Sequence, residues 1–586
     1  MYADDKSKSD TIALTVKSPW DNIDWRKAEK ETKKLQGRIA KAVKDGNQRK
    51  VKALQWILSK SFYAKSLAVR RVTTNKGGKT PGVDGVILKT PEEKTQMVKS
   101  LRRLGYKAHP LRRIFIPKTN GKQRALGIPT VKDRAMQALH LSTLEPVSET
   151  TGDLNSYGFR PYRACRDAAE QLFNCLARKT SSRWVLEADI LGCFDNISHD
   201  WLMNHVPMDK KILHDWLKSG FVWQKRLFPT DAGTPQGGIA SPVLANLALD
   251  GMEEVLSVNF QPKWGQENPK VNLVRYADDF IVTGASPEIL ERAKSIICLF
   301  LEERGLRFSP EKTKISNIRD GFDFLGWNFR KYGKTQEKFL ITPSKKNVKA
   351  FLENVKRIVE KSIGVSQEAL IHQLNLKIKG WTEYHKNQVA KETFQLVDHR
   401  IWRMTWHWAT RRHPDKSAAW IRNRYWKAEN GRSWVFTTKT VFHGKVTDLR
   451  LMKAADVPIR RYTKIKSNMN PYDLNSEEYF EKRAFNLAKG EKIPVKVMKL
   501  IVSQKGVCAY CKRSFIEDME KFQEHDWHVH HIKLKLYGGN DNLSNLALLH
   551  PVCHRDIHRR MKCELPVALN GNQEATRPVR REAVNA

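Results

Sequence analysis

Two adjacent carboxylates, Asp278 and Asp279, lie between the apolar residues of LVRYADDFIV, which runs from Leu273 to Val282. The flanking apolar residues predict the two strands of a hairpin, which would place both carboxylates at its tip. A third acid, Asp189, lies near the end of the apolar stretch WVLEADI. Carboxylate oxygens are the ligands that Mg²⁺ prefers, and nucleotidyl transfer uses two divalent cations about 3.5–4 Å apart. We therefore predict that these three acids, together with Ile190, bind two Mg²⁺ ions.

The four letters YADD are weak evidence on their own, because they also occur at Tyr2–Asp5. No apolar stretch precedes that copy, and we interpret it as a coincidence. The copy at residues 276–279 has the apolar context of a strand hairpin, and further motifs accompany it along the chain.

Cysteine and histidine residues are concentrated near the C-terminus. Two pairs, Cys508-x₂-Cys511 and His550-x₂-Cys553, have the spacing of tetrahedral zinc ligands. A second set of polar side chains lies between and beyond these pairs and comprises His530, His531, Asn545, His554 and His558. The last two are four residues apart, so they would lie on one face of a helix. The pairs alone fit a zinc finger that only grips DNA, whereas the added set favours a catalytic metal centre.

Strands and helices must bring these groups together. Residues 21–73 have the lysine-rich, glycine-poor pattern of helices, and residues 76–85 are typical of a loop. Between about 110 and 330, strand-like stretches alternate with helical ones, and the clearest strands are Trp184–Ile190, Val271–Tyr276 and Phe280–Thr283. After about residue 340 the pattern changes to helices rich in Lys, Arg and Trp.

The charge of the chain favours a polyanionic partner. The formal net charge is +41 over 586 residues, and cationic side chains that neutralise phosphates release condensed counterions. Residues 331–470 hold 30 basic and 11 acidic side chains and seven of the 17 tryptophans. Any one of these rings is best interpreted as core, but basic charge interleaved with aromatics favours a nucleic-acid surface. No apolar stretch approaches the roughly twenty residues that span a bilayer, so we expect a soluble protein. Four cysteines that cluster near the C-terminus indicate metal binding in a reducing cytoplasm, and we expect the protein to be associated with the nucleoid there.

Motifs on both sides of the acids resemble those of the reverse transcriptases of group II introns. Seven of them follow the family's order, and they are RRIFIPKTNGKQRALGIPTVKDR (112–134), SYGFRPYR (156–163), LEADILGCFDNI (186–197), GTPQGGIASPVLANLALD (233–250), LVRYADDFIV (273–282), SPEKTKI (309–315) and FDFLGWNF (322–329). The resemblance implies a right-hand polymerase, with fingers and a palm, that copies RNA into DNA. Ala125 stands where the family usually has proline, which concerns loop rigidity rather than chemistry.

The same resemblance implies nucleotide-binding roles for several side chains. Lys118 and Arg124 match the positions that grip the incoming triphosphate, and Gln236 matches a residue beside the substrate. Lys312 matches a lysine that protonates pyrophosphate. A bulky ring at Phe194 would collide with a 2′-hydroxyl and so select deoxynucleotides, although a core phenylalanine under the active site is compatible with the same position.

Residues 340–450 resemble the family's thumb, or maturase domain X, with the best match at IKGWTEYHK (378–386). In such proteins this region and the N-terminal extension bind the intron RNA and help it to fold for splicing. The resemblance therefore implies an intron RNA partner.

The C-terminal set of histidines resembles the HNH nucleases in their ββα-metal form. The residues that match ligands of the catalytic metal, Mg²⁺ or Mn²⁺, are His530, His554 and His558. His531 matches the general base, a role that suits a neutral imidazole, and Asn545 matches the residue that orients this base. The residues that we assign to a structural Zn²⁺ are Cys508, Cys511, His550 and Cys553, although the family often has cysteine where His550 stands.

We therefore predict an α+β multidomain chain that is similar to a group II intron-encoded protein of bacterial type. Its expected parts are an N-terminal helical extension (1–75), fingers and palm (76–335), a helical thumb (336–452), a DNA-binding region and linker (453–495), an HNH endonuclease (496–570) and a tail (571–586). The implied function is retrohoming: the intron RNA inserts into one DNA strand, the HNH module nicks the other, and the exposed 3′ end primes copying. The expected partners are intron RNA, target DNA and deoxynucleoside triphosphates, with no membrane.

Two alternatives remain open on the sequence. One is a polymerase that no longer promotes splicing. The other is a splicing cofactor with inactive enzymes, and the presence of every catalytic acid and histidine argues against it. A diversity-generating or defence-associated reverse transcriptase fits less well, because neither explains the thumb and the HNH module together.

Overall fold

The structure is a computed structural model. It describes residues 18–117, 121, 123–262, 264–265, 267–333, 337–429, 431–442, 445–490, 495–504, 506–511, 515, 527–535 and 538–563. Lys118 lies outside the described residues. None of the described helices is both long and apolar enough to cross a membrane.

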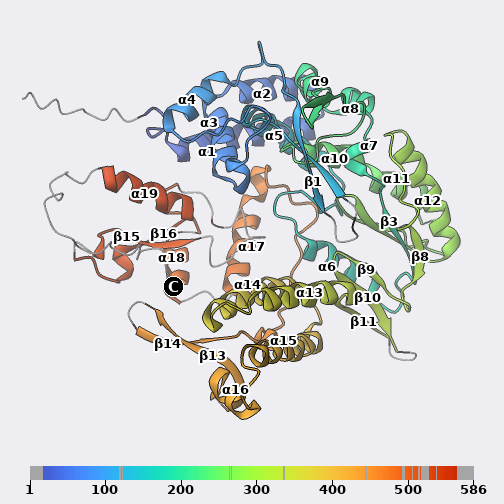
Figure 1. Cartoon of the computed structure of the whole chain (residues 1–586). Coiled ribbons are helices and arrows are strands. Elements are labelled where there is room, and N and C mark those ends of the chain that lie inside the picture. The colour runs from blue at the N-terminus through green and yellow to red at the C-terminus, as the bar shows by residue number, and fades with distance from the viewer. Residues whose placement is uncertain are drawn as a thin grey trace, which may run out of the picture.

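Three N-terminal helices pack against a long buried helix, as Figure 1 shows at its top. They are α1 (Trp25–Lys44), α2 (Gln48–Lys60) and α3 (Phe62–Thr74), and the buried helix is α5 (Val131–Thr151). A polar side chain precedes each of the three and accepts a hydrogen bond from a first-turn backbone N–H, and these caps are Asp24, Asn47 and Ser61. The helices predicted for residues 21–73 are therefore confirmed. A further helix, α4 (Pro91–Ser100), leads into the fingers.

The fingers contain a four-stranded sheet in the order β2-β1-β4-β5. Its strands are β1 (Leu111–Pro117), β2 (Gln123–Ile128), β4 (Phe221–Trp223) and β5 (Arg226–Phe228). The first two form an antiparallel hairpin, and β4 joins β1 in parallel. Segments about a hundred residues apart in the chain therefore build one surface.

The palm contains a second four-stranded sheet, in the order β6-β7-β3-β8. Its strands are β3 (Trp184–Asp189), β6 (Asn272–Tyr276), β7 (Asp279–Gly284) and β8 (Lys314–Asn317), all paired antiparallel. The helices that contact it are α6 (Cys165–Leu176), α11 (Met252–Asn259) and α12 (Pro287–Glu302). The three strands predicted from the sequence are confirmed within a residue or two at each end.

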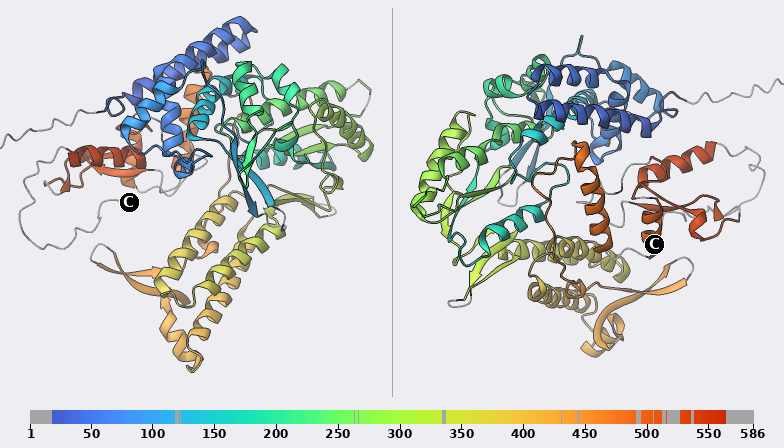
Figure 2. Two further views of the ribbon diagram at one scale, coloured as in Figure 1. Left: turned by 45° about the horizontal axis from the view of Figure 1, so that its top comes forward. Right: turned by 180° about the vertical axis from the view of Figure 1, so that it is seen from behind.

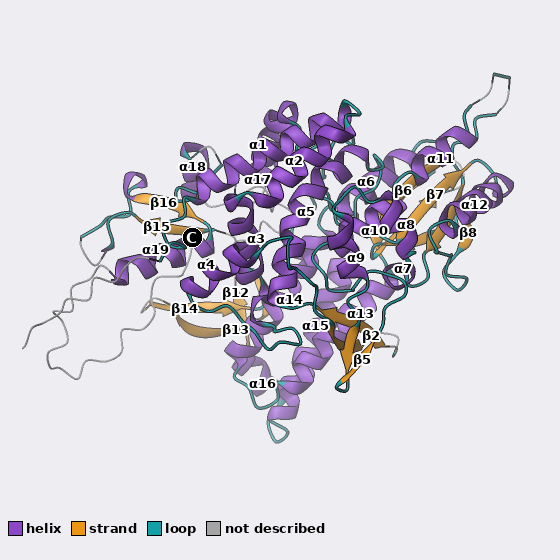
Figure 3. Cartoon of the chain, turned by 90° about the horizontal axis from the view of Figure 1, so that it is seen from above, coloured by secondary structure: helices purple, strands orange, loops and turns teal. Residues whose placement is uncertain are grey.

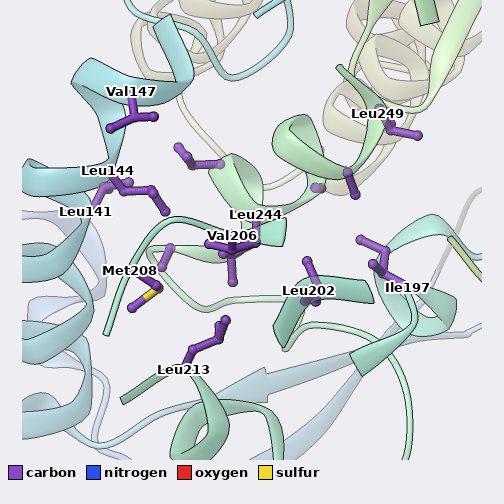
Figure 4. Packing of buried hydrophobic residues seen from close by; sticks show 14 of the residues in the cluster. Leu141, Leu144, Val147, Ile197, Leu202, Val206, Met208, Leu213, Leu244 and Leu249 are labelled. Atoms are coloured by element: carbon purple, nitrogen blue, oxygen red, sulfur yellow. The ribbon is translucent and has the colours of Figure 1, made fainter. Parts of the chain in front are cut away.

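One continuous apolar core joins the N-terminal helices to the palm. Figure 4 shows the part of it between α5 and the helices α7 (Cys193–Asn196), α8 (His199–His205), α9 (Lys210–Leu217) and α10 (Ser241–Leu249). The side chains labelled there are Leu141, Leu144, Val147, Ile197, Leu202, Val206, Met208, Leu213, Leu244 and Leu249. Because both parts contribute to one core, the N-terminal helices stabilise the palm.

The thumb follows a three-stranded sheet of β9 (Phe322–Phe324), β10 (Trp327–Tyr332) and β11 (Lys338–Pro343). Its helices are α13 (Lys345–Lys361), α14 (Gln367–His385), α15 (Lys391–Arg412) and α16 (Ala418–Tyr425). Beyond them lie β12 (Trp426–Glu429), β13 (Arg432–Phe442) and β14 (Lys445–Arg450), drawn as strands in Figure 3. The sequence predicted helices throughout this region. The strands were missed because basic residues and tryptophans obscure the β-branched residues of β13.

Four tryptophans of the thumb pack together in one cluster, and they are Trp402, Trp406, Trp426 and Trp434. Trp408 and Trp426 are buried, and Trp402 stacks on Trp406 with ring centroids 6.4 Å apart. The ring of Trp434 lies across both at centroid distances of 5.8 and 5.6 Å. The interpretation of single rings as core is therefore confirmed for Trp408 and Trp426.

Residues 457–476, here called the return segment, run from the thumb back to the palm and the N-terminal helices. The Tyr462 hydroxyl donates to the buried Asp167 carboxylate at 3.0 Å, and the Ile465 N–H donates to the same carboxylate at 2.6 Å. The Tyr472 hydroxyl donates to Glu145 at 2.7 Å. The sequence predicted a DNA-binding region and linker over residues 453–495, and part of that stretch is fixed to the rest of the protein by these hydrogen bonds.

The C-terminal part has a core of its own. Its elements are α18 (Val495–Ser503), β15 (His528–His531), β16 (Leu546–Leu549) and α19 (Pro551–Cys563), and the two strands pair antiparallel. Helix α17 (Glu477–Gly490) precedes it and lies between the N-terminal helices and the thumb in both Figure 1 and Figure 2. The ββα order that the sequence predicted is confirmed.

Candidate active sites

The three predicted polymerase acids meet at one edge of the palm sheet. Strand β7 pairs with both β3 and β6, so that Asp279 lies directly opposite Asp189 on one side and opposite Tyr276 on the other. Asp278 occupies the turn between β6 and β7, next to Ala277. The register of β3 against β7 therefore places two carboxylates that are 90 residues apart in the sequence next to each other.

The electrostatics of this edge fit a divalent cation. Burial, a hydrogen bond with Asp189 and the charge of Asp278 together raise the pKa of Asp279 to about 7. Burial also raises the pKa of Asp278, with a contribution from Asp189. Carboxylates that are buried together repel one another, and a hard cation between them relieves that repulsion. The donor set is all oxygen, which is the set that Mg²⁺ prefers.

Lys312 approaches the same acids from the loop before β8. Its Nζ lies 2.6 Å from Asp189 Oδ2, and this hydrogen bond raises the pKa of the lysine. The backbone around it is tied to the acid as well, since the Ser309 N–H donates to the Asp189 carbonyl at 2.7 Å. Ile190 also pairs with Phe308 through an isolated bridge. The loop that carries Lys312 therefore lies beside the end of β3.

The remaining predicted nucleotide residues lie around this edge. Arg124 is exposed on β2, and its charge partly offsets the rise in the pKa of Asp278 that burial causes. The side chain of Gln236 donates from Nε2 to Asp195 Oδ2 at 3.2 Å. The backbone carbonyl of Gln236 accepts from the Gly127 N–H at 2.8 Å. This second bond joins the fingers hairpin to the loop before α10.

The position of Gly237 needs glycine, because its φ is +117° and an added Cβ would lie 2.7 Å from the Gly127 carbonyl oxygen.

Phe194 is half-buried in α7, five residues after Asp189. The ring of Phe159 meets it edge-on at a centroid distance of 6.0 Å, and the Phe194 carbonyl accepts from the Thr234 N–H at 2.6 Å. The ring of Phe194 is therefore partly packed and partly exposed. This placement is compatible both with a ring that excludes a 2′-hydroxyl and with a core phenylalanine under the active site.

A second centre forms in the C-terminal part. His530 extends from β15, and His554 and His558 extend from one face of α19, with the two helix Nε2 atoms 3.2 Å apart. One ring nitrogen from each of the three lies within 4.8 Å of the others. Burial, followed by the neighbouring histidines, lowers the pKa of His530 and of His554 to about 4. Neutral imidazoles are the form that binds a metal ion.

His531 lies beside this centre, and its ring has a partner that the sequence did not indicate. Its Nε2 lies 2.8 Å from Asp541 Oδ1. Asn545 instead braces the backbone, because its side chain accepts from the Lys533 N–H at 2.8 Å and donates to the carbonyls of Lys533 and Asn540. No spacing rule of the sequence relates Asp541 to His531.

A third cluster holds four soft or borderline ligands. Cys508, Cys511, His550 and Cys553 each place a ligand atom within 4.8 Å of the others, and Cys511 Sγ lies 3.3 Å from His550 Nδ1. Three sulfurs and one imidazole form a donor set that suits tetrahedral zinc. The cluster also meets the N-terminal helices, because the Arg70 guanidinium lies 4.0 Å from Cys553 Sγ.

Comparisons with protein families divide the chain in the same way. The N-terminal domain of reverse transcriptase matches residues 20–101, and reverse transcriptase (RNA-dependent DNA polymerase) matches residues 116–329. The maturase-specific domain of group II introns matches residues 348–426, and the HNH endonuclease family matches residues 508–560.

Individual relatives agree with these matches. Protein YkfC of Escherichia coli is 34% identical over 302 residues, covering 44% of this chain and 78% of YkfC. The group II intron-encoded protein LtrA of Lactococcus lactis is 28% identical over 394 residues, covering 53% of this chain and 65% of LtrA. Maturase-like protein 1 of Euglena gracilis is 28% identical, covering 63% of this chain and 77% of that protein. The chain belongs to the group II intron-encoded proteins, and it carries a reverse transcriptase, a maturase domain and an HNH endonuclease.

Proposed function

We propose that Asp189, Asp278 and Asp279 bind two Mg²⁺ ions and that this centre extends a DNA primer along an RNA template. The observation that carries the proposal is the cross-strand pairing of Asp189 with Asp279, with Asp278 in the adjoining turn. Bound Mg²⁺ would activate the primer hydroxyl and neutralise charge on the leaving pyrophosphate. The carboxylates hold this position because β3 and β7 are fixed in register by six residue pairs.

We propose that Arg124, Lys312 and Gln236 bind the incoming nucleotide, with Lys118 as a further contact. Arg124 and Lys312 supply positive charge on two sides of the acids, from β2 and from the loop before β8. In the free chain the Lys312 ammonium neutralises Asp189, so nucleotide binding would exchange that carboxylate for phosphate oxygens. Its ammonium would then be the group that donates a proton to pyrophosphate.

Replacing Phe194 by Val should admit ribonucleotides, because the smaller side chain leaves room for the 2′-hydroxyl. Discrimination against ribonucleotides, measured as the ratio of kcat/KM values for dNTP and rNTP, should fall by about tenfold or more. Phe308→Val is the matched control, since that ring packs beside the palm sheet against Phe280 with centroids 6.2 Å apart. A Phe194→Val variant that folds and still rejects ribonucleotides would make Phe194 a core residue.

We propose that His530, His554 and His558 bind the catalytic metal of the HNH module and that His531 is its general base. The geometry supports this, because three imidazoles converge while the ring of His531 is hydrogen-bonded to Asp541 instead. The bound divalent cation would stabilise the charge that develops on the cleaved phosphate. The hydrogen bond from His531 Nε2 leaves Nδ1 as the atom that can accept a proton from water. Asn545 would act by fixing the loop that carries Asp541.

We propose that Cys508, Cys511, His550 and Cys553 bind a structural Zn²⁺. The three cysteines are buried and belong to the small C-terminal core. Metal ligation would therefore supply a large part of the folding free energy of this module.

We propose that the thumb binds the intron RNA. Exposed basic side chains line α13 and α15, and they include Lys345, Lys346, Lys349, Arg357, Arg400 and Arg403. Changing these six residues to Ala should flatten the dependence of log affinity on log salt by about 0.7 for each phosphate contact that is lost. The measurement is RNA binding across a salt series. Six substitutions with no change in slope would contradict the proposed surface, and Lys211, Lys218 and Lys294 to Ala provide a palm control.

We propose that the chain as a whole promotes splicing of its intron and then retrohoming by target-primed reverse transcription. The supporting observation is that polymerase, maturase and nuclease domains occur in one chain, each with the side chains its chemistry requires. The test for the maturase part is splicing of a precursor RNA in vitro at low Mg²⁺. Splicing that is unaffected by the protein would favour a polymerase without maturase activity.

A further inference from the structure

The turn that carries Asp278 is strained. Ala277 precedes it with φ of +59°, in the left-handed region that residues with a Cβ seldom adopt. Such a conformation is unfavourable for a residue with a Cβ and persists only when the surrounding structure holds it in place. The residues that hold Ala277 in this conformation therefore help to set the positions of Asp278 and Asp279.

Arg275 holds this turn from inside the protein. Its side chain is completely buried, and its guanidinium donates to the Ala277 carbonyl at 3.5 Å and to Asn246 Oδ1 at 3.3 Å. It also forms an ion pair with Asp250, and Asn246 and Asp250 both belong to the α10 end of the palm. A planar guanidinium can reach three acceptors at once, which an ammonium cannot do with the same geometry.

The opposite side of the turn is closed by backbone. Gly158 lies against Ala277 so closely that an added Cβ would be 2.3 Å from the Ala277 nitrogen. The Gly158 carbonyl accepts from Asn246 Nδ2 at 2.9 Å. Neighbouring backbone bonds tie the same segments, since the Tyr157 N–H donates to the Arg275 carbonyl at 2.9 Å. Asn246 thus connects both supports of the turn.

We propose that Arg275 is a positioning residue for the polymerase centre: through the Ala277 carbonyl it fixes the turn, and with it the direction of Asp278 and Asp279 toward Asp189. Asn246 and Gly158 complete the support. The residue touches no reacting atom, so its effect reaches the reaction only through the carboxylates. The inference rests on the proposed metal-binding role of these acids.

The test compares Arg275→Lys with Gly158→Ala, which disturb the same turn from opposite sides. Both should lower kcat for primer extension about tenfold or more and raise the Mg²⁺ concentration for half-maximal rate several-fold, because the ligands are misaligned. Mn²⁺ binding, followed by electron paramagnetic resonance in a complex with chain-terminated primer, template and dNTP, should weaken by a similar factor. The HNH centre contributes equally in wild type and variant, so the difference reports the polymerase centre.

Arg304→Lys is the matched control, because that guanidinium also supports α10, donating to the Ala248 carbonyl at 2.8 Å, without reaching the turn. It should leave the Mg²⁺ dependence unchanged. If Arg275→Lys does not fold, Gly158→Ala decides alone. Variants with wild-type Mg²⁺ dependence and Mn²⁺ affinity would overturn the proposal, whatever their Tm. If Asp279→Asn itself leaves Mn²⁺ affinity unchanged, the metal-binding role of the acids fails, and the positioning role of Arg275 fails with it.

Discussion

Replacing Asp278 and Asp279 together by Asn should abolish RNA-templated DNA synthesis while leaving the protein folded. The amides keep the shape of the turn but lose the charge that holds two cations. The expected loss of kcat is on the order of 10³-fold or more, because several kcal/mol of transition-state stabilisation disappear. Primer extension on a homopolymer RNA template with a DNA primer measures it directly.

Two features make this experiment specific. Burial raises the pKa of both carboxyls, so their neutral replacement should leave Tm unchanged or higher. Asp320→Asn is the matched control, since that carboxylate is exposed in a palm turn. RNA binding and DNA nicking should survive in the double variant. Processive synthesis by the double variant would show that other acids hold the metal ions.

Replacing His531 by Ala should stop DNA nicking while cDNA synthesis on a supplied primer stays near the wild-type rate. Removing a general base costs about 10²–10⁴-fold, and the three rings assigned to the metal remain in place. Nicking of a labelled duplex target and primer extension are measured on the same preparation. His372→Ala, which changes a histidine of the thumb helix α14, is the control.

Substitution of the proposed zinc ligands should stop nicking for a different reason from substitution of His531. Changing Cys508 and Cys511 to Ser should also stop nicking, but by unfolding the C-terminal core that contains both sulfurs. Limited proteolysis separates the two outcomes, because only the cysteine variant should become protease-sensitive in this module. Nicking by the His531 variant at the wild-type rate would contradict the HNH assignment and favour a zinc finger that only binds DNA.

The sequence was sufficient for the features that depend on local pattern. Apolar stretches around Asp278 and Asp279 predicted the hairpin, and the ligand spacing in Cys508-x₂-Cys511 and in His554 with His558 predicted the two C-terminal clusters. In each case neighbouring residues in the chain determine which side chains share a strand tip or a helix face. The register that places Asp189 opposite Asp279 follows from the same apolar pattern.

Features that depend on long-range packing could not be predicted in this way. The return segment is polar, yet it is anchored because Asp167 and Glu145, some 300 residues earlier, accept its hydrogen bonds. Asp541 contacts His531 from ten residues further along the chain, and no local sequence pattern indicates that contact. Arg275 resembled any arginine of a basic protein until its burial against Asp250 was known. In each case the role of the residue depends on a partner elsewhere in the sequence, so the residue type and its neighbours in the chain do not predict it.

The most direct test of the whole account is to sequence the junction between new cDNA and target DNA. Purified protein with its spliced intron RNA is incubated with an intact duplex target and dNTPs, and then with the same target already nicked. Wild type should yield cDNA covalently joined to the 3′ end at the nick on both substrates, and His531→Ala should do so only on the nicked one. cDNA from the His531 variant on intact DNA at the wild-type level, or wild-type cDNA that is never joined to the target, would contradict target-primed copying by this chain.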